Sequence, residues 1–482
     1  MAQKIVIDPV TRIEGHLKVE VEVENGIVVD AHTSGTLFRG FELIMQGRDP
    51  RDAQQIMQRI CGVCPTSHAT SGALALDDAF GIEPPPNGRI IRNLIFGSNY
   101  IQSHILHFFH LAALDYVKAP EGVMPLNPQY AGDYRLPADI NAQAVNNYLK
   151  ALEMRRKAQE MLAIWGGKMP HVQAIVPGGV TELPDTQKIY EFLVRLEELT
   201  DFINNVYVPT VKAVAEAYPD WFDIGRGCMN MLAYGGFPLE EGRDHVSKQK
   251  FFPSGVYVRG QFKELDPALI TEEVKYSWYK DDTGGNSPDV AVVEPDADKK
   301  DAYSWLKAPR YNGEPMEVGP LARQWVAKQP DLVAMGANKA FSVMGRHYAR
   351  AVETAAIAAA MKEWVLQLKP GEPVATPHKV PDEALGMGLC EASRGALGHW
   401  HKIEHGRTKV LNAVVPTTWN AGPRDVNNVP GPMEQAIIGA PLADPANPIE
   451  VVRIIRSMDP CFGCAIHVMT PNKKTISQFI VN

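Results

Sequence analysis

RICGVC at residues 59–64 and DPCFGC at residues 459–464 are the two stretches that organise this chain of 482 residues. Each contains a CxxC pair, in which two intervening residues let the backbone curl until both sulfur atoms can face one ion. The pairs are Cys61 with Cys64 and Cys461 with Cys464. Four converging thiolates would form a site for a soft metal ion.

The separation of the two pairs determines what kind of site they can form. A zinc ribbon places its pairs about 15–20 residues apart, so that one small loop folds around the ion. Here 396 residues separate Cys64 from Cys461. Closing a loop about twenty times longer costs roughly 2.5–3 kcal/mol more, which a small structural knuckle would not need. We therefore expect the site to join the two ends of a globule with its own core. A structural zinc site with four thiolates stays open as the alternative.

The composition is that of a large globular protein. Hydrophobic residues make up 45% of the chain and charged residues 22%, which allows a sizeable core. The formal net charge of −8 argues against a basic surface for nucleic acid. MAQKIVIDPV lacks the apolar core of a signal peptide, and charged residues interrupt the most apolar long stretch, at 351–368. We therefore expect neither an export signal nor a membrane span in this chain.

The periodicity of apolar residues predicts the fold class. Alternation on both sides of Asn25-Gly26 predicts a β-hairpin with a two-residue turn. Helical spacing follows at 53–60, 69–80, 90–117, 142–165 and 186–217. Surface hairpins and loops are expected at 240–313, helices again at 316–368, and short strands at 370–450. The predicted fold is α+β and predominantly α-helical: one large unit with a bundle of long helices, small peripheral hairpins and sheets, and a buried metal site where the CxxC pairs meet.

Seven blocks between Asp8 and His467 point to a family. They are DPVTRIEGHLKVEVEVENG, FRGFE, RICGVCPTSHATSGALALDDAFGI, NLIFGSNYIQSHILHFFHLAALDYV, SRGALGHW, VVPTTWNAGPRD and MDPCFGCAIH. In this order they resemble the large subunit of nickel-iron hydrogenases, over nearly the whole chain. The resemblance implies an oxidoreductase that splits dihydrogen reversibly into protons and electrons.

The resemblance implies different roles for the cysteines of each pair. Cys61 and Cys461 would be terminal ligands of nickel, whereas Cys64 and Cys464 would bridge nickel to an iron that carries carbonyl and cyanide ligands. Heterolytic cleavage also needs a base within hydrogen-bond reach, which the thiolate of Cys461 or Cys464 can supply. Glu14 in RIEG matches the carboxylate that passes the proton outward. Some close relatives have selenocysteine at the position of Cys461.

Several polar residues match positions around the metal pair of the family. Arg394 matches an arginine suspended over the metals, and Ser393 stands where the family usually has proline. Thr417 matches a hydroxyl residue that hydrogen-bonds a cyanide. Asp459 and Asp115 match acidic residues that surround the cluster, where such partners orient the ligands and tune the redox potential.

Four histidines need separate interpretation. His68, in CPTSH, can donate a hydrogen bond to a bridging sulfur, although such a histidine taken alone is more often part of the core. His104, His107 and His110 recur every third residue of one predicted helix, which can suggest a metal site. Their drift around the helix instead favours packing or a proton path, and we do not expect them to be ligands.

The last block carries two further implications of the resemblance. Glu42 and His467 match a second metal site of the family, which usually holds magnesium. In the family, a dedicated endopeptidase cuts directly after this histidine once nickel-insertion factors have loaded the site. Residues 1–467 would then form the hydrogenase domain and 468–482 a maturation extension that is removed.

Electron transfer requires a partner. After the four ligands only Cys228 and Cys390 remain, and we interpret both as buried free thiols. Because no cysteines are left for iron-sulfur centres, electrons would leave through the family's iron-sulfur small subunit. That subunit bears the export signal in the family, which implies a periplasmic or membrane-associated heterodimer; a cytoplasmic location stays open. A hydrogen-sensing homologue and a redox-inert relative of the same fold also stay open as interpretations.

Overall fold

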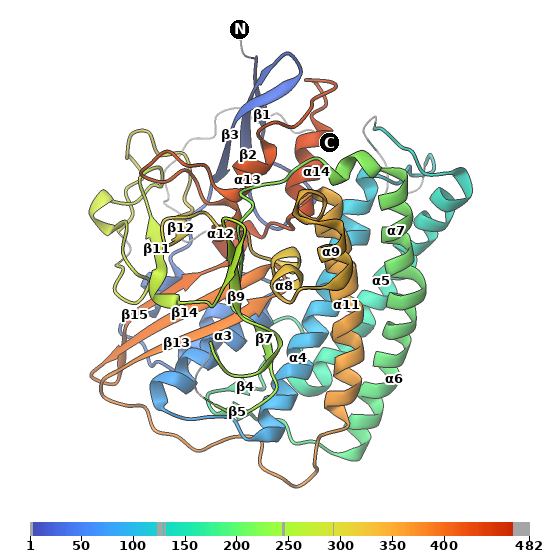
Figure 1. The fold of residues 1–482 in the computed structure, drawn as a ribbon. Helices are drawn as coiled ribbons and strands as arrows, with labels where there is room; N and C mark the ends of the chain where they lie inside the picture. Colours follow the sequence, from blue (N-terminus) through green and yellow to red (C-terminus); the bar gives the residue numbers. More distant parts are fainter. Residues whose placement is uncertain (1–2, 123–128, 130–131, 243–245, 293, 466–482) are drawn as a thin grey trace.

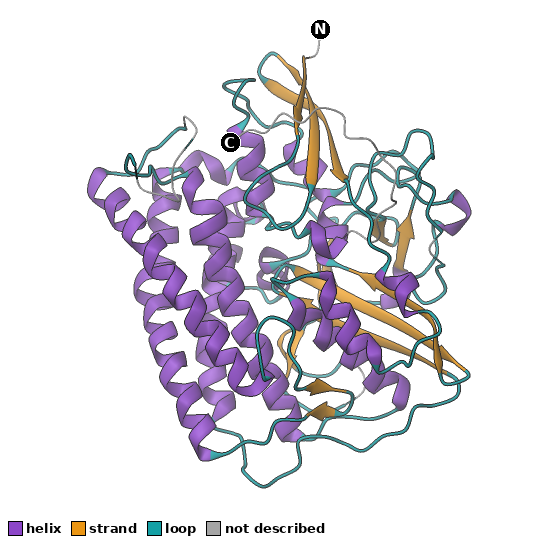
Figure 2. Ribbon diagram, turned by 180° about the vertical axis from the view of Figure 1, so that it is seen from behind, coloured by secondary structure: helices purple, strands orange, loops and turns teal. Residues whose placement is uncertain are grey.

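The computed structural model describes residues 3–122, 129, 132–242, 246–292 and 294–465. Long helices run side by side along one flank of the molecule, and most of the strands lie on the other flank (Figures 1 and 2). In the described ranges, no helix combines the length and the apolar character that crossing a bilayer requires. The predicted ligand His467 and the predicted extension 468–482 lie outside the described residues.

The helical flank contains the longest elements of the chain. They are α4 (Pro86–Ile105), α5 (Ala138–Gly166), α6 (Thr186–Phe202), α7 (Val208–Ala217) and α11 (Val343–Val365). π-helical turns extend α4 as far as Ala112 and join α6 to α7. At Gly97 of α4 an added Cβ would lie 2.5 Å from Sδ of Met361 in α11, so this glycine allows the two helices to approach closely. The helix-rich character predicted from the spacing is confirmed.

The N-terminal strands form the predicted hairpin. β1 (Gln3–Ile7), β2 (Leu17–Glu24) and β3 (Ile27–Gly35) pair antiparallel, with β2 in the middle. Asn25 and Gly26 have φ values of 51° and 75°, and positive values at both positions are those of a type I′ turn. Buried apolar residues of β2 alternate with more exposed neighbours, so one face of the hairpin covers the core.

A second antiparallel sheet contains β13 (Ala384–Ala392), β14 (Gly395–Glu404) and β15 (Arg407–Val414). Helix α3 (Pro65–Phe80) lies directly on β13. A Cβ added at Gly386 or Gly388 would come within 2.0 or 2.1 Å of a carbonyl oxygen of α3. This sheet is largely buried, so the expectation of small peripheral sheets is wrong here. The glycines that let a helix cover the strand are the physical reason.

Shorter elements complete the fold. The remaining strands are β4 (Ile175–Val176), β5 (Gly179–Val180), β6 (Met231–Ala233), β7 (Gly236–Pro238), β8 (Lys250–Phe252), β9 (Gly255–Val258), β10 (Gln261–Lys263), β11 (Ile270–Glu273) and β12 (Ala308–Tyr311). The remaining helices are α1 (Phe41–Met45), α2 (Asp52–Met57), α8 (Pro320–Val326), α9 (Pro330–Met335), α10 (Ala337–Ala340), α12 (Pro416–Ala421), α13 (Pro432–Ile437), α14 (Ile449–Ser457) and α15 (Phe462–Ala465). The described part of the stretch 240–313 consists of short strands, two 3₁₀ turns and loops, as predicted, although β12 is buried.

One apolar core holds both CxxC pairs. The largest cluster of buried apolar side chains runs from Ile7 to Cys464 and includes all four predicted cysteine ligands. Of the two remaining cysteines, Cys390 lies in the same core, whereas Cys228 is half-buried. The two CxxC pairs therefore meet in the interior of the protein.

Candidate metal centre

The two CxxC segments meet beside Glu14. Cys61 follows a short 3₁₀ turn, and Cys64 directly precedes α3. Cys461 directly precedes α15. The backbone N–H of Phe462 donates to the carbonyl oxygen of Glu14 at 2.8 Å, next to a parallel bridge between Glu14 and Cys461. A backbone contact between the first and last parts of the chain thus fixes the second pair.

The four sulfur atoms surround one point. The separations of the closest sulfur atoms are 2.9 Å for Cys461 and Cys464, 3.2 Å for Cys64 and Cys464, and 3.4 Å for Cys61 and Cys461. All four atoms are buried and lie within 4.8 Å of one another. A disulfide would bring two sulfur atoms to about 2.05 Å, so all four thiols are unbonded and available as ligands.

The shared site shifts the pKa values of the thiols in opposite directions. Hydrogen bonds from the neighbouring thiols, first that of Cys461, lower the pKa of Cys61 well below its ordinary value. Burial, followed by contact with Cys464, raises the pKa of Cys461 well above its ordinary value. Several thiolates cannot share a buried site without a cation, because like charges raise one another's pKa values. A metal cation would supply that charge, and four sulfur donors suit a soft metal ion such as nickel or zinc.

A small cavity of about 10 Å³ adjoins the sulfur atoms. Its lining consists of Cys64, Ser67, His68, Ala392, Arg394, Leu397, Pro416, Thr417, Cys461 and Cys464. Oγ of Ser67 and Nε of Arg394 are buried and have no hydrogen-bond partner in the part of the chain that is described. Buried polar atoms are usually paired with protein, water or a ligand. The cavity therefore suits small polar ligands on a metal held by the cysteines.

Glu14 contacts the second pair directly. Its Oε2 lies 3.0 Å from Sγ of Cys461 and accepts a hydrogen bond from the backbone N–H of Gly463 at 2.8 Å. Burial, then the nearby Cys61, raises the pKa of Glu14 above its ordinary value. An added Cβ at Gly15, which has a φ of 84°, would lie 2.4 Å from the nitrogen of Gly463. The approach of the two segments therefore depends on glycine.

Arg394 also lines the cavity. Its Nη2 forms a buried ion pair with Oδ1 of Asp459 at 3.1 Å, and its Nη1 lies 3.5 Å from Oγ of Ser103. Burial opposes the charge of the guanidinium, but Asp459 and the nearby cysteines outweigh it and hold the pKa of Arg394 well above its ordinary value. Oγ of Ser393 lies 3.1 Å from Oγ of Ser103. Arg394 thus remains a fixed positive charge, and Ser103, which was not expected from the sequence, joins the polar residues around it.

Thr417 supports the backbone of the second pair. Its Oγ1 accepts a hydrogen bond from the N–H of Cys461 at 2.8 Å, and the residue also lines the cavity. Because the hydroxyl oxygen acts as acceptor here, its hydrogen is available to donate in another direction.

Asp115 does not line the cavity. Its buried carboxylate pairs with Arg12 and accepts a hydrogen bond from Nη1 of Arg456 at 2.6 Å. Arg12 lies two residues before Glu14, and Arg456 lies five residues before Cys461. Asp115 therefore anchors the two segments that meet at the cluster.

The histidines divide into two groups. His68 lines the cavity, and its Nδ1 lies 3.2 Å from Nε2 of His399, a residue that nothing in the sequence had singled out. The Nε2 atoms of His104, His107 and His110 lie beside Oε1 of Glu353 and the carbonyl oxygens of Arg456 and Tyr148, respectively. Each of the three histidines thus has a different protein partner, and the expectation that they are not ligands stays a prediction.

Glu42 is buried in α1. It accepts a hydrogen bond from the N–H of Ala413 at 3.1 Å, and Nζ of Lys307 lies 4.0 Å from its Oε1. The same ammonium group pairs with Oε2 of Glu272 at 2.8 Å. Because His467 lies outside the described residues, the predicted second metal site stays a prediction.

Arg39 links both CxxC segments and was missed as a functional residue. Its Nη1 donates to the carbonyl oxygens of Ile60 at 2.6 Å and Gly463 at 3.3 Å, and its Nη2 donates to that of Arg59 at 2.7 Å. Ile60 precedes Cys61, and Gly463 precedes Cys464. The available signal was an arginine in FRGFE, since a planar guanidinium can serve several acceptors at once.

Comparison with known proteins agrees with this geometry. The family described as nickel-dependent hydrogenase matches residues 39–123 and 119–467, and a HoxL-like family matches residues 4–34. The chain is 46% identical to the periplasmic NiFeSe hydrogenase large subunit of Desulfomicrobium baculatum, over 99% of this chain and 97% of that protein. It is 34% identical to the hydrogenase-2 large chain of Escherichia coli, over 97% and 98% of the two chains. The solved Ni-Fe-Se hydrogenase from D. vulgaris Hildenborough in the reduced state superposes with a TM-score of 0.94 at 47% identity, covering 97% of this chain and all of that one.

Proposed function

This chain belongs to the nickel-dependent hydrogenase family as a catalytic large subunit, and we propose that dihydrogen is split at the four-sulfur cluster with Cys461 and Glu14 as the proton-handling groups. When bound there, a nickel-iron pair supplies the electrophilic centre that polarises dihydrogen and accepts its electrons. The observation that carries the proposal is the contact between Glu14 and a cluster of four buried thiols. Side chains of this protein would bind the metals, transfer the proton and orient the other ligands.

The cysteines would divide between the two metals by their position in each pair. Cys61 and Cys461 are proposed as terminal ligands of nickel, and Cys64 and Cys464 as bridges to iron. The convergence of all four sulfur atoms supports one shared metal site. The division into terminal and bridging ligands rests on the family resemblance. The cavity beside Cys64 and Cys464 supports carbonyl and cyanide as further ligands of iron, since it is small and buried and polar side chains contribute to its lining.

Proton transfer would begin at a thiolate. A base must lie within hydrogen-bond reach of the proton that it takes. Between Cys461 and Cys464, the contact of Glu14 favours Cys461 as the base, because Oε2 of Glu14 lies 3.0 Å from its sulfur. The pKa of Glu14 is raised toward neutral pH, which suits a group that takes up and releases a proton.

The polar residues of the cavity would hold the charged ligands of the iron. Arg394 would place a fixed positive charge there, with Asp459 orienting its guanidinium. Thr417 carries a hydroxyl group that would hydrogen-bond one cyanide, and Ser393, whose hydroxyl contacts Ser103 and which does not line the cavity, would lie near the other. His68 would face a bridging sulfur, with His399 fixing its ring. Asp115 would not contact the metals; it would position the two CxxC-proximal segments through its ion pairs with Arg12 and Arg456.

Two proposals concern the C-terminal region. Glu42 and His467 would hold magnesium at a second site, and the burial of the Glu42 carboxylate supports such a site. Residues 1–467 would form the hydrogenase domain, and a maturation endopeptidase would remove 468–482 after nickel insertion. Both rest on the family resemblance.

A partner would carry the electrons away. Relatives of this chain are named large subunits or large chains, and one of them is named periplasmic. We propose a heterodimer with an iron-sulfur small subunit in the periplasm. The described residues offer the four clustered cysteines to the active-site metals, so further redox centres would belong to the partner.

Infrared spectroscopy of the anaerobically purified complex, with and without dihydrogen, tests the proposal. Sharp metal-carbonyl and metal-cyanide bands that shift under dihydrogen are expected, together with nickel in metal analysis. Glu14→Gln should retain the bands and lose turnover. Nickel-loaded protein without such bands would refute the iron assignment, and zinc in place of nickel would return the site to a structural role.

A further inference from the structure

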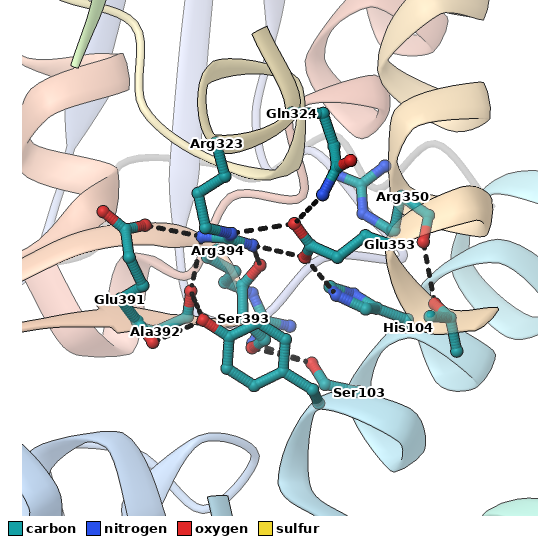
Figure 3. A network of polar contacts seen from close by, with 12 residues as sticks. Ser103, His104, Arg323, Gln324, Arg350, Glu353, Glu391, Ala392, Ser393 and Arg394 are labelled. Carbon is teal, nitrogen blue, oxygen red and sulfur yellow. Dashed lines mark hydrogen bonds and ion pairs between the residues drawn. The ribbon is translucent and has the colours of Figure 1, made fainter. Parts of the chain in front are cut away.

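Arg323, in α8, is fully buried and uses every donor of its guanidinium (Figure 3). Its Nε and Nη2 donate to the two carboxylate oxygens of Glu353 at 2.9 and 2.6 Å. Its Nη1 donates to Oε2 of Glu391 at 2.7 Å. The other two donors reach the carbonyl oxygens of Ala392 and Ser393, each at 2.9 Å. Since a guanidinium has five N–H groups, none remains unused.

The two carbonyls belong to the turn that carries Arg394. Ala392 ends β13, and Ser393 directly precedes Arg394. The hydroxyl of Tyr100 donates to the carbonyl of Glu391, the residue before Ala392, and lies 3.1 Å from the carbonyl oxygen of Ala392. On the other side of the turn, a Cβ added at Gly395 would lie within 2.6 Å of Val318. The backbone on both sides of Arg394 is therefore held from several directions.

Glu353 fixes Arg323 in turn. It lies on α11 and also contacts His104 at 3.0 Å and Gln324 at 3.3 Å. Arg323 thus connects the helical bundle to the turn between β13 and β14 (Figure 3).

The guanidinium of Arg394 has few contacts of its own. Besides the ion pair with Asp459, its nearest partner is Oγ of Ser103 at 3.5 Å, which is a long hydrogen bond. Its Nε has no hydrogen-bond partner among the described residues. The location of this guanidinium in the cavity therefore depends mainly on where the backbone places it.

We propose that Arg323 is a positioning residue for Arg394, which it holds over the sulfur cluster by fixing the carbonyls of Ala392 and Ser393. This proposal rests on the role assigned to Arg394 in the proposed function. It predicts that Arg323 affects turnover only through Arg394. Displacing a catalytic group by about 1 Å can reduce the rate about 100-fold.

The test compares variants of the complete enzyme, purified with its small subunit. Arg323→Lys keeps a buried charge, but one ammonium group cannot serve two carboxylates and two carbonyls. Tyr100→Phe loosens the same turn from another side and keeps the size of the ring. Arg310→Lys is the matched control, because Arg310 is equally buried, pairs with Asp425 at 2.8 Å and also holds backbone carbonyls. Each variant is also made in an Arg394→Lys background.

We expect Arg323→Lys to lower kcat about tenfold to 100-fold, with unchanged KM for dihydrogen and unchanged nickel content. Tyr100→Phe should lower kcat about threefold to tenfold, since it removes the hydrogen bond that holds the carbonyls of Glu391 and Ala392, directly before the turn. Both losses should disappear in the Arg394→Lys background, which a double-mutant cycle measures. The infrared bands of Arg323→Lys should shift as those of Arg394→Lys do, and those of Arg310→Lys should not.

Two results would overturn the inference. One is a loss in Arg323→Lys and Tyr100→Phe that multiplies with that of Arg394→Lys, because the residues would then act independently. The other is an equal effect of Arg310→Lys, which would indicate general destabilisation. If Arg323→Lys does not fold, the Tyr100→Phe cycle decides. An unchanged kcat in Arg394→Lys itself would instead refute the proposed role of Arg394.

Discussion

Replacing Gly463 with alanine should disconnect Glu14 from Cys461 without removing either residue. A Cβ at position 463 would lie 2.4 Å from Oε1 and 2.6 Å from Oε2 of Glu14. Side-chain atoms pack at about 3.5 Å, so the carboxylate would have to withdraw by about 1 Å. The contact of 3.0 Å between Oε2 and the sulfur of Cys461 would then lengthen to about 4 Å, beyond the reach of a hydrogen bond.

The expected loss follows from the role of that contact. A positioned proton-transfer group contributes about 100-fold to 10,000-fold to a rate. Because the carboxyl stays nearby, we expect the lower end for Gly463→Ala, about 100-fold in kcat, which equals about 2.7 kcal/mol of activation free energy. Glu14→Gln should lose at least as much, and Gly463→Ala should add little to it.

Dihydrogen oxidation with a dye acceptor measures the loss, and nickel analysis shows whether the site is still loaded. Gly62→Ala is the matched control, because it changes a glycine inside the first CxxC pair and its Cβ would meet nothing within 4 Å. It should stay within about twofold of the unmodified enzyme, as expected for a surface change without a structural mechanism. If nickel-loaded Gly463→Ala keeps more than a third of the turnover, the Glu14 relay is not the working path.

Two further predictions concern stability and metal retention. Burial raises the pKa of Glu434 from 4.5 to about 7, so between these values the folded protein holds a proton that the unfolded chain releases, and stability falls as the pH rises. Across this window the free energy of unfolding should fall by up to about 3 kcal/mol more in the unmodified protein than in Glu434→Gln. The prediction would be contradicted if the unfolding midpoints of the two metal-free proteins changed equally with pH. Arg39→Lys should release nickel to a chelator about tenfold faster, because an ammonium group cannot bridge both CxxC segments and a charged hydrogen bond contributes about 1.5 kcal/mol. Arg51→Lys is the control, because Arg51 pairs only with Asp49 among the described residues, and it should release nickel at the original rate. Equally fast nickel release from Arg51→Lys and Arg39→Lys would show that Arg39 has no special role.

Local sequence patterns correctly predicted the long helices and the hairpin, whose formation depends mainly on residues close together in the sequence. The turn at Asn25-Gly26 requires positive φ at two positions, which these residues tolerate, and the hairpin forms there. The long helices follow the 3.6-residue spacing. The buried sheet of β13–β15 was underestimated, because its burial depends on α3 docking against Gly386 and Gly388 from more than 300 positions away. Such contacts leave no periodic signal in the strand itself.

The candidate site could be predicted in outline from the cysteine pairs and the family resemblance. The structure brings Glu14, Arg394 and Thr417 to the four sulfur atoms, although their roles remain proposals. Arg39, Ser103, His399 and Arg323 were missed, because each acts through carbonyls or side chains distant in sequence. A single arginine or serine in a helix or loop carries no sign of such partners.

Because the site needs both CxxC pairs, it cannot form until the ribosome has synthesised the second pair. At about 5–20 residues per second, the ribosome needs roughly 20–80 seconds to advance from Cys64 to Cys461. During that interval, Cys61 and Cys64 are reduced thiols without half of their site, and their burial awaits strands that are not yet made. Thiols in that condition can be oxidised or can capture the wrong metal. If the four cysteines hold a metal as proposed, the complete ligand set exists only after Cys464 has been made, so full coordination has to follow synthesis.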